Sequence, residues 1–107
     1  MNTTSYISIG GRQEVKPEEV LMLQAEINYT LVYFVNGRKT IVATPLKKLE
    51  ERFTPFEFYR THKSYLVNLK CVKCFIEPTN TLQMADNHNV IVSRRKRTGL
   101  KEYLKDR

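Results

Sequence analysis

The chain is divided into short β-rich segments, each ended by turn-forming residues, and this pattern is the main constraint on its fold. β-Branched and aromatic residues, or an alternation of polarity, predict short strands over residues 6–9, 14–16, 20–25, 29–35, 38–43, 58–60, 72–76, 81–84 and 90–92. Asn36-Gly37 predicts a tight hairpin, because both residues can adopt positive φ in a two-residue turn. Six to nine short strands of this kind favour a mainly β fold built from antiparallel hairpins.

One or two short helices are predicted between these strands. Thr44 is expected to cap a helix that begins at Pro45 and ends near Thr54, with apolar residues at helical spacing at Leu46, Leu49 and Phe53. Ser93 could cap a final helix that carries Leu100, Tyr103 and Leu104. Neither segment resembles the long recognition helix of a helix-turn-helix protein, so DNA recognition by this chain would depend on loops or strand ends.

The size of the chain suits one compact domain over residues 1–107. Hydrophobic residues make up 41% of it, so folding is expected rather than disorder. Its apolar runs are too short to span a bilayer, and the sequence of residues 1–4 lacks the charged and apolar parts of a signal peptide. We therefore expect a cytoplasmic protein with no membrane partner.

The net charge of +7 is unevenly distributed along the chain. Residues 1–27 carry two cations and four anions, whereas residues 58–74 carry four cations and no acid. Residues 93–107 carry seven cations against Glu102 and Asp106. Segregated positive charge suggests a polyanionic partner, because each neutralised phosphate releases counterions. On charge alone, a solvated basic face is an equally good interpretation.

The segment over residues 58–68 interleaves polar donors with apolar anchors. The anchors would hold its tip, in which Lys63 offers a point charge to phosphate or guanine, and His62 and Ser64 can each bind a phosphate oxygen. The alternative is that His62 and Asn68 only satisfy backbone groups of a turn. For Asn68 we prefer that structural alternative, and for Lys63 we prefer function, since no structural role requires a lysine there.

The second basic segment is Ser93-Arg94-Arg95-Lys96-Arg97. Successive side chains at a strand-to-helix junction point in different directions, so some could enter a groove while others meet phosphates. Arginine can bind guanine O6 and N7 in a bidentate way. A solvated helix start is the alternative, but cations at a helix N-terminus oppose the macrodipole, which suggests a use for them.

These features resemble the LytTR family of bacterial DNA-binding domains over residues 20–104. The matching stretches are the strand and turn that end in Asn28-Tyr29-Thr30, the Pro45–Leu49 helix, the block over residues 58–68, and Val92–Arg95. The resemblance implies a mainly β fold, with an elongated arrangement of small antiparallel sheets and hairpins and one or two short helices. It also implies a bacterial transcriptional regulator that binds duplex DNA sequence-specifically, through loops inserted into successive major grooves.

The resemblance also assigns roles to the residues of the site. Base contacts would come from the Asn28-Tyr29-Thr30 turn, with Tyr29 at a reading position, from Lys63, and from the loop with Arg94 and Arg95, where Arg95 aligns best. Phosphate contacts would come from His62, Ser64, Arg60, Ser93 and Lys96. Side chains at the reading positions vary across the family, so the resemblance does not give the DNA sequence.

Family members usually carry a receiver domain before this one. The Met1 start and the additional strand over residues 6–9 favour a stand-alone domain, and the alternative is a fragment of a longer response regulator. We expect two copies to bind paired DNA sites, with a receiver or sensor protein as a further partner.

Cys71-Val72-Lys73-Cys74 could form half of a zinc site or a redox disulfide. A second cysteine pair is missing from the sequence, and residues three apart in a strand point to opposite faces. We therefore expect reduced cysteines that lie partly in the core, with no metal and no cofactor.

Three other functions compete with the binding of duplex DNA. Scattered acids, separated histidines and the lack of a nucleophile or phosphate-loop motif argue against an enzyme. A single-stranded RNA-binding module could stack bases on aromatic side chains, although most of these occupy strand positions that a core needs: Tyr29, Tyr33, Phe34, Phe56, Phe58 and Tyr59. A basic protein-interaction domain would show no salt-dependent binding of DNA.

Overall fold

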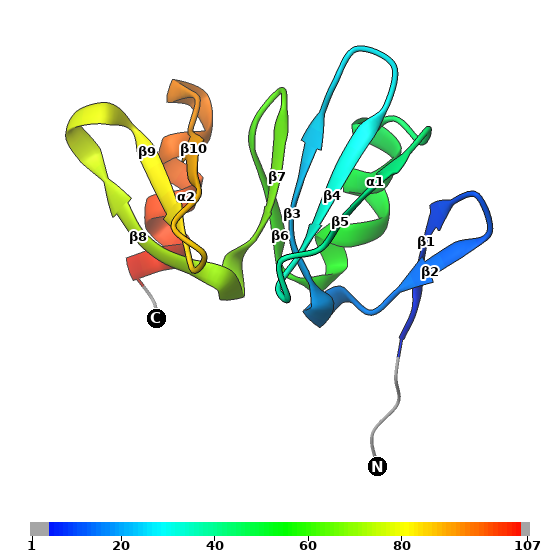
Figure 1. Cartoon of the computed structure of the whole chain (residues 1–107). Helices are drawn as coiled ribbons and strands as arrows, with labels where there is room; N and C mark the ends of the chain where they lie inside the picture. The colour runs from blue at the N-terminus through cyan, green and yellow to red at the C-terminus, as the bar shows by residue number, and fades with distance from the viewer. Residues whose placement is uncertain (1–4, 106–107) are drawn as a thin grey trace.

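The computed structural model describes residues 5–105, which fold into three antiparallel sheets and two α-helices (Figure 1). The first sheet pairs β1 (Ile7–Gly10) with β2 (Gln13–Val15). The second has the order β5-β4-β3-β7-β6 and consists of β3 (Val20–Ala25), β4 (Thr30–Phe34), β5 (Lys39–Val42), β6 (Phe58–His62) and β7 (Tyr65–Asn68). The third has the order β10-β9-β8 and consists of β8 (Val72–Ile76), β9 (Thr81–Met84) and β10 (Asn89–Ile91). The helices are α1 (Leu46–Phe53) and α2 (Arg94–Lys105).

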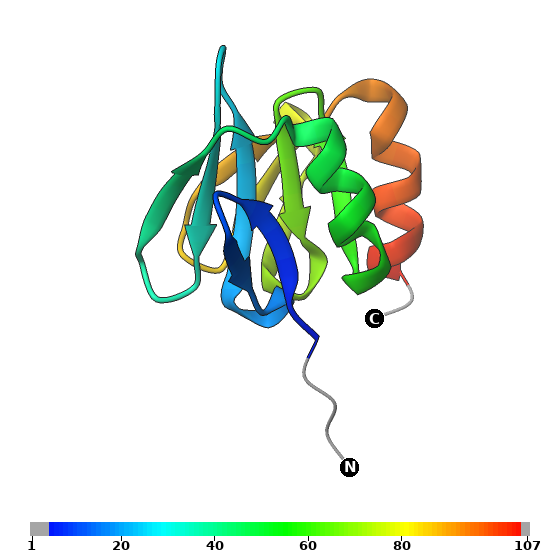
Figure 2. The same cartoon turned by 90° about the vertical axis from the view of Figure 1, so that its right-hand side faces the viewer.

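The prediction of a mainly β fold with small antiparallel sheets is confirmed, but the strands were undercounted. Ten strands are present in the described residues, because the apolar cluster after Ser64 is itself a strand, β7. The molecule measures 40 × 40 × 24 Å, so it is extended in two directions and thin in the third (Figure 2). Residues 1–4, for which no signal peptide is predicted, lie outside the described residues, as do Asp106 and Arg107.

Two hydrophobic cores lie on the two faces of the five-stranded sheet. Alternation along a strand sends neighbouring side chains to opposite faces, as Leu66 and Val67 of β7 show. Leu66 belongs to the core formed with α1 and the β1–β2 hairpin, and Val67 belongs to the core formed with the three-stranded sheet and α2. The central strands of the five-stranded sheet are therefore covered on both faces, and its loops remain at its ends. Over the described residues, no helix is both long and apolar enough to cross a membrane.

Helix α1 packs as predicted but begins one residue later. Its apolar face is buried at Leu46, Leu49 and Phe53. The cap position belongs to Pro45, whose carbonyl accepts from the backbone N–H groups of Lys48 and Leu49. The predicted cap by Thr44 is wrong, because its hydroxyl donates to the carbonyl of Ile9 at 2.8 Å and so joins the β1–β2 hairpin to the sheet.

The predicted two-residue turn at Asn36-Gly37 is also wrong in detail. The loop contains Val35 as well, because the N–H of Phe34 donates to the carbonyl of Arg38 across its base. Only Gly37 adopts positive φ, at 92°, and its N–H donates to the carbonyl of Phe34 at 3.0 Å. This arrangement is a three-residue hairpin loop, in which a β-turn is followed by a left-handed glycine.

Helix α2 lies against β6 through an unusually close contact. The hydroxyl of Tyr59 donates to the carbonyl of Lys96 at 2.9 Å. Burial raises the pKa of Tyr59, so the hydroxyl keeps its proton and remains a donor. A Cβ atom on Gly99 would lie 2.5 Å from the Tyr59 hydroxyl oxygen. Glycine at position 99 therefore permits the first turns of α2 to approach the strand.

We predict that Gly99→Ala destabilises the protein, although alanine is the better helix former by about 1 kcal/mol. The added methyl group would displace the Tyr59 hydroxyl and break its hydrogen bond to Lys96. In a Tyr59→Phe background the nearest ring atom is Cζ at 3.4 Å, so Gly99→Ala should there be neutral or stabilising. Denaturant unfolding of the four variants measures the coupling, expected at about 1–3 kcal/mol. Equal stabilisation by Gly99→Ala in both backgrounds would contradict the prediction.

Candidate nucleic-acid interface

Three loops meet at one end of the molecule. The register pairs Ala25 with Thr30, Gln24 with Tyr65, and His62 with Tyr65, so the β3–β4 and β6–β7 turns lie at the same end of the five-stranded sheet. The start of α2 joins them, since the N–H of Ser93 donates to the carbonyl of Thr61 at 2.8 Å. Figures 1 and 2 show all three at the upper end of the molecule. The residues predicted to bind DNA, separated in the sequence, are thus brought together.

The β3–β4 loop is closed by a hydrogen bond from the N–H of Glu26 to the carbonyl of Tyr29 at 2.8 Å. Asn28 is exposed, and the Tyr29 side chain is 39% exposed, so both can meet a ligand. Thr30 is different, because it is 1% exposed and its hydroxyl donates to the carbonyl of Thr44 at 2.8 Å. In this structure Thr30 anchors the loop from inside and presents no surface for contact with DNA.

Ile27, at the tip of the same loop, was missed by the sequence analysis. It is 95% exposed, the largest exposure among the large hydrophobic side chains of the described residues. An apolar residue between Glu26 and Asn28 in a predicted turn was the available signal, because turns normally carry polar residues there. A side chain of this kind can contact the methyl group of thymine.

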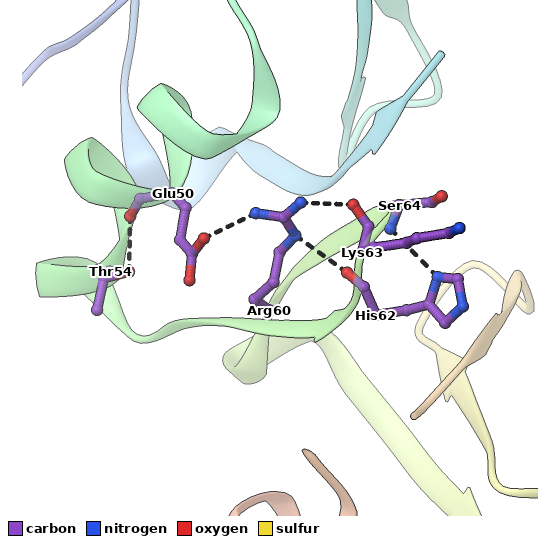
Figure 3. A network of polar contacts seen from close by, with 6 residues as sticks. All are labelled: Glu50, Thr54, Arg60, His62, Lys63 and Ser64. Atoms are coloured by element: carbon purple, nitrogen blue, oxygen red, sulfur yellow. Dashed lines mark hydrogen bonds and ion pairs between the residues drawn. The ribbon is translucent and has the colours of Figure 1, made fainter. Parts of the chain in front are cut away.

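The β6–β7 turn consists of Lys63 and Ser64 and is bound by several hydrogen bonds (Figure 3). Nδ1 of the half-buried His62 accepts from the N–H of Ser64 at 3.2 Å. The neutral ring then carries its proton on Nε2, which can donate to a phosphate oxygen. The carbonyl of Ser64 accepts from the N–H of Ala25 at 2.8 Å, which connects this turn to the β3–β4 loop. Lys63 is exposed, and Figure 3 shows its side chain extending away from the turn.

Arg60 lies under this turn and is largely withdrawn from solvent. Its side chain is 18% exposed and forms an ion pair with Glu50 of α1 at 2.7 Å. Its guanidinium also donates to the carbonyls of His62 and Lys63. The predicted phosphate ligand is thus close to the other site residues, but its hydrogen bonds are made within the protein.

The third loop of the site is the connection from β10 to α2, taken together with the first turn of α2. The carbonyl of Ser93 accepts from the N–H groups of Lys96 and Arg97, so Ser93 is the residue at which the helix begins to hydrogen-bond. The ammonium group of the half-buried Lys96 lies 5.8 Å from the centre of the Tyr59 ring. Arg94 and Arg95 are exposed on the first turn of the helix, where their charges oppose its macrodipole.

Ion pairs within the described residues compensate some of the cations and leave several at this end unpaired. Lys70 pairs with Glu57 at 3.3 Å, and Lys101 pairs with Glu77 at 3.1 Å. Within residues 5–105, the side chains of Lys63, Arg94 and Arg95 form no hydrogen bond or ion pair with the protein. These three cations are therefore available to an external anion.

Asn68 serves the fold, and the two cysteines differ in their exposure. Asn68 is 2% exposed, donates to the carbonyl of Val20 at 2.9 Å and accepts from the N–H of Lys70, which confirms its structural role. Cys71 is half-buried against the second core, and Cys74 is exposed on β8. Burial, and then the charge of Asp86, raises the pKa of Cys71. No group of three or more metal-binding side chains occurs among the described residues.

Most of the aromatic side chains proposed for base stacking serve the cores. Phe58 is 3% exposed, and Phe34 and Phe56 pack against the first core. Tyr33 and Tyr59 pack against the second core and use their hydroxyls in hydrogen bonds to Gln24 and Lys96, respectively. Tyr29 alone of that set lies in one of the three loops, so these six residues form no continuous aromatic platform for single-stranded RNA within the described part of the chain.

Comparison with known proteins gives the family and the fold of the chain. A family model of the LytTr DNA-binding domain matches residues 12–105. The sensory transduction protein LytT of Oceanobacillus iheyensis is 34% identical over 59 residues, which cover 55% of this chain and 24% of that protein. The matched part therefore spans about a quarter of the length of this relative. A solved LytTr DNA-binding domain from Bacillus cereus superposes with a TM-score of 0.75 at 20% identity, covering 97% of this chain and 98% of that one.

Proposed function

The chain belongs to the LytTr DNA-binding domain family, and from this premise we propose that it regulates bacterial transcription by sequence-specific binding of duplex DNA. In this proposal the three loops at the upper end of the molecule enter major grooves on one face of the duplex. The family is one of DNA-binding domains. The partner is thus a nucleic acid, and no catalytic group, metal or cofactor takes part.

One observation carries the proposal: unpaired cations and neutral donors share three adjacent loops that the fold holds in place. Lys63 and Arg95 come from different loops and would reach base edges, with Tyr29, Asn28 and Arg94 beside them. Ile27 would contact a thymine methyl group. The remaining donors would bind phosphates and fix the register on the duplex: His62, Ser64, Ser93 and Lys96.

The cellular setting is also proposed. The relative LytT is a sensory transduction protein, of which this chain matches about a quarter, so a receiver or sensor protein is the expected source of a signal. The protein would act in the bacterial cytoplasm, where its DNA is. Two copies would bind two neighbouring DNA elements, because one small module has a limited interface of roughly 600–1,000 Å².

We predict that affinity for duplex DNA falls steeply with salt. Contact with about four to six phosphates gives a slope of roughly −4 to −5 for log affinity against log salt concentration. Fluorescence anisotropy over a range of KCl concentrations measures this slope. A flat titration would contradict DNA binding, and tighter binding of a single-stranded competitor would favour the RNA-binding alternative.

We predict that Lys63→Ala and Arg95→Ala each cost about 1–3 kcal/mol on the preferred sequence and relax preference at particular base pairs. His62→Ala and Lys96→Ala should weaken all duplexes nearly uniformly, because these residues would contact phosphate rather than bases. The preferred sequence is first selected from a random duplex pool. The affinity of each variant is then measured on that site and on each of its single-base-pair changes.

Arg38 and Lys105 provide matched controls for these substitutions. Arg38 lies in the β4–β5 loop and Lys105 ends α2, both at the opposite end of the molecule from the three loops (Figure 1). Lys47, in contrast, borders a 320 Å³ pocket with Tyr29, so it is unsuitable as a control. If Arg38→Ala and Lys105→Ala cost as much as Arg95→Ala and Lys63→Ala, net charge drives binding and the loop-reading proposal fails.

We predict that occupancy is higher on a probe with two spaced elements than on a probe with one. Two adjacent copies would add their interfaces, and each single interface is small. Mobility shifts on both probes give the affinity per element. An equal affinity per element on both probes would argue against cooperation between the copies, without affecting the proposal of DNA binding.

A further inference from the structure

The β6–β7 turn is a two-residue hairpin turn without the backbone conformation that usually stabilises such turns. His62 pairs with Tyr65, so Lys63 and Ser64 are the only residues between the strands. The favoured two-residue hairpin turns place one or both residues at positive φ. Neither Lys63 nor Ser64 adopts positive φ, and the register shifts between Arg60 and His62. The conformation of this turn therefore depends on contacts from outside its own backbone.

Arg60 supplies such contacts from beneath the turn. Its Nε donates to the carbonyl of His62 at 3.0 Å, and its Nη2 donates to the carbonyl of Lys63. Two adjacent carbonyls are thus bound by one rigid planar fork, which a lysine could not reproduce. Figure 3 shows the guanidinium between Glu50 and the turn, on the side away from the Lys63 side chain.

Glu50 fixes the orientation of that fork. Its carboxylate accepts from Nη1 of Arg60 at 2.7 Å, and the two side chains are 33% and 18% exposed, respectively. Glu50 lies on α1, whose apolar face is buried in the first core, so the guanidinium is tied to a rigid element. The path of fixed contacts runs from α1 through Glu50 and Arg60 to the backbone of Lys63.

We propose that Glu50 and Arg60 form a positioning pair that sets the direction of the Lys63 side chain, and that Arg60 does not itself bind phosphate. This inference rests on the proposed function of Lys63 as a base-reading residue. A carboxylate near the DNA-facing end opposes DNA binding by simple electrostatics. The benefit of Glu50 would be preorganisation, because a side chain that reads bases must be held close to the geometry in which it contacts them.

Glu50→Gln tests the proposal, and Glu51→Gln is its matched control. Both remove one negative charge from α1, but Glu51 is exposed and forms no hydrogen bond or ion pair within the described residues. Charge alone predicts equal or tighter binding of DNA by both variants. Positioning predicts that Glu50→Gln lowers discrimination at the base pair read by Lys63 by about fivefold or more, and that Glu51→Gln does not. The measurement is affinity for the selected duplex and for its single-base-pair changes.

Two further variants separate positioning from phosphate contact. Arg60→Lys keeps the charge but loses the fork, so we expect reduced discrimination with an unchanged salt slope. Arg60→Gln should also leave the slope of log affinity against log salt concentration unchanged. If Arg60 instead bound a phosphate, its loss would reduce the magnitude of that slope by about 0.9. In a Lys63→Ala background, Glu50→Gln should have no further effect at that base pair, because the two residues act through the same side chain.

The outcomes keep the two proposals apart. If Lys63→Ala leaves discrimination unchanged, the reading role of Lys63 fails, whatever Glu50 does. If Lys63→Ala abolishes discrimination and Glu50→Gln matches Glu51→Gln, the positioning pair is overturned. It is equally overturned if Glu50→Gln weakens all duplexes to the same extent while lowering the free energy of unfolding, since that result describes a structural residue only.

Discussion

Strand β6 is the element on which both basic loops depend. Its side chains alternate between two tasks: Tyr59 holds the first turn of α2 through the carbonyl of Lys96, and Arg60 holds the β6–β7 turn through two carbonyls. The backbone carbonyl of Thr61, the next residue along the strand, accepts from the N–H of Ser93 at 2.8 Å. One strand of five residues thus fixes the distance between the loop with Lys63 and the loop with Arg95, without any contact between the two side chains.

This arrangement also explains how like charges can be kept at one end of a small protein. Each cation in the free protein raises the electrostatic energy of its neighbours and of the α2 N-terminus. Hydrogen bonds hold the backbone of these loops: Ala25 to Ser64, Ser93 to Thr61, and Glu26 to Tyr29. Because these bonds involve backbone groups, they leave the ends of Lys63, Arg94 and Arg95 free for a phosphate or a base. The stability lost to repulsion is supplied by the two cores beneath.

Periodicity and turn residues were enough to predict the β class, the bounds of β3, β8 and β9, and the apolar face of α1, because these depend on local alternation. The features that the sequence did not show depended on distant partners. Thr44 is a sound cap by its local sequence, yet its hydroxyl binds the carbonyl of Ile9, 35 residues away. The resemblance placed Thr30 in a turn that meets DNA, but its position in the register turns its side chain inward. The resemblance grouped Arg60 with the phosphate ligands, and its pairing with Glu50 follows only from the packing of α1 against β6.

A protein that reads DNA with a helix obtains rigidity from the helix itself, whereas one that uses loops must obtain it from the surroundings. An unsupported loop would lose conformational entropy on binding, and that loss would reduce affinity and blur the difference between correct and incorrect base pairs. The internal bonds of Arg60, His62, Ser64 and Thr30 pre-order these loops in the free protein. Some residues of a binding loop therefore face the ligand, some fix the backbone, and His62 and Ser64 would do both, so polarity in the sequence does not distinguish these roles. In this fold, a short polar turn without positive φ, flanked by the half-buried Arg60, marks a place where the backbone is fixed from outside the turn.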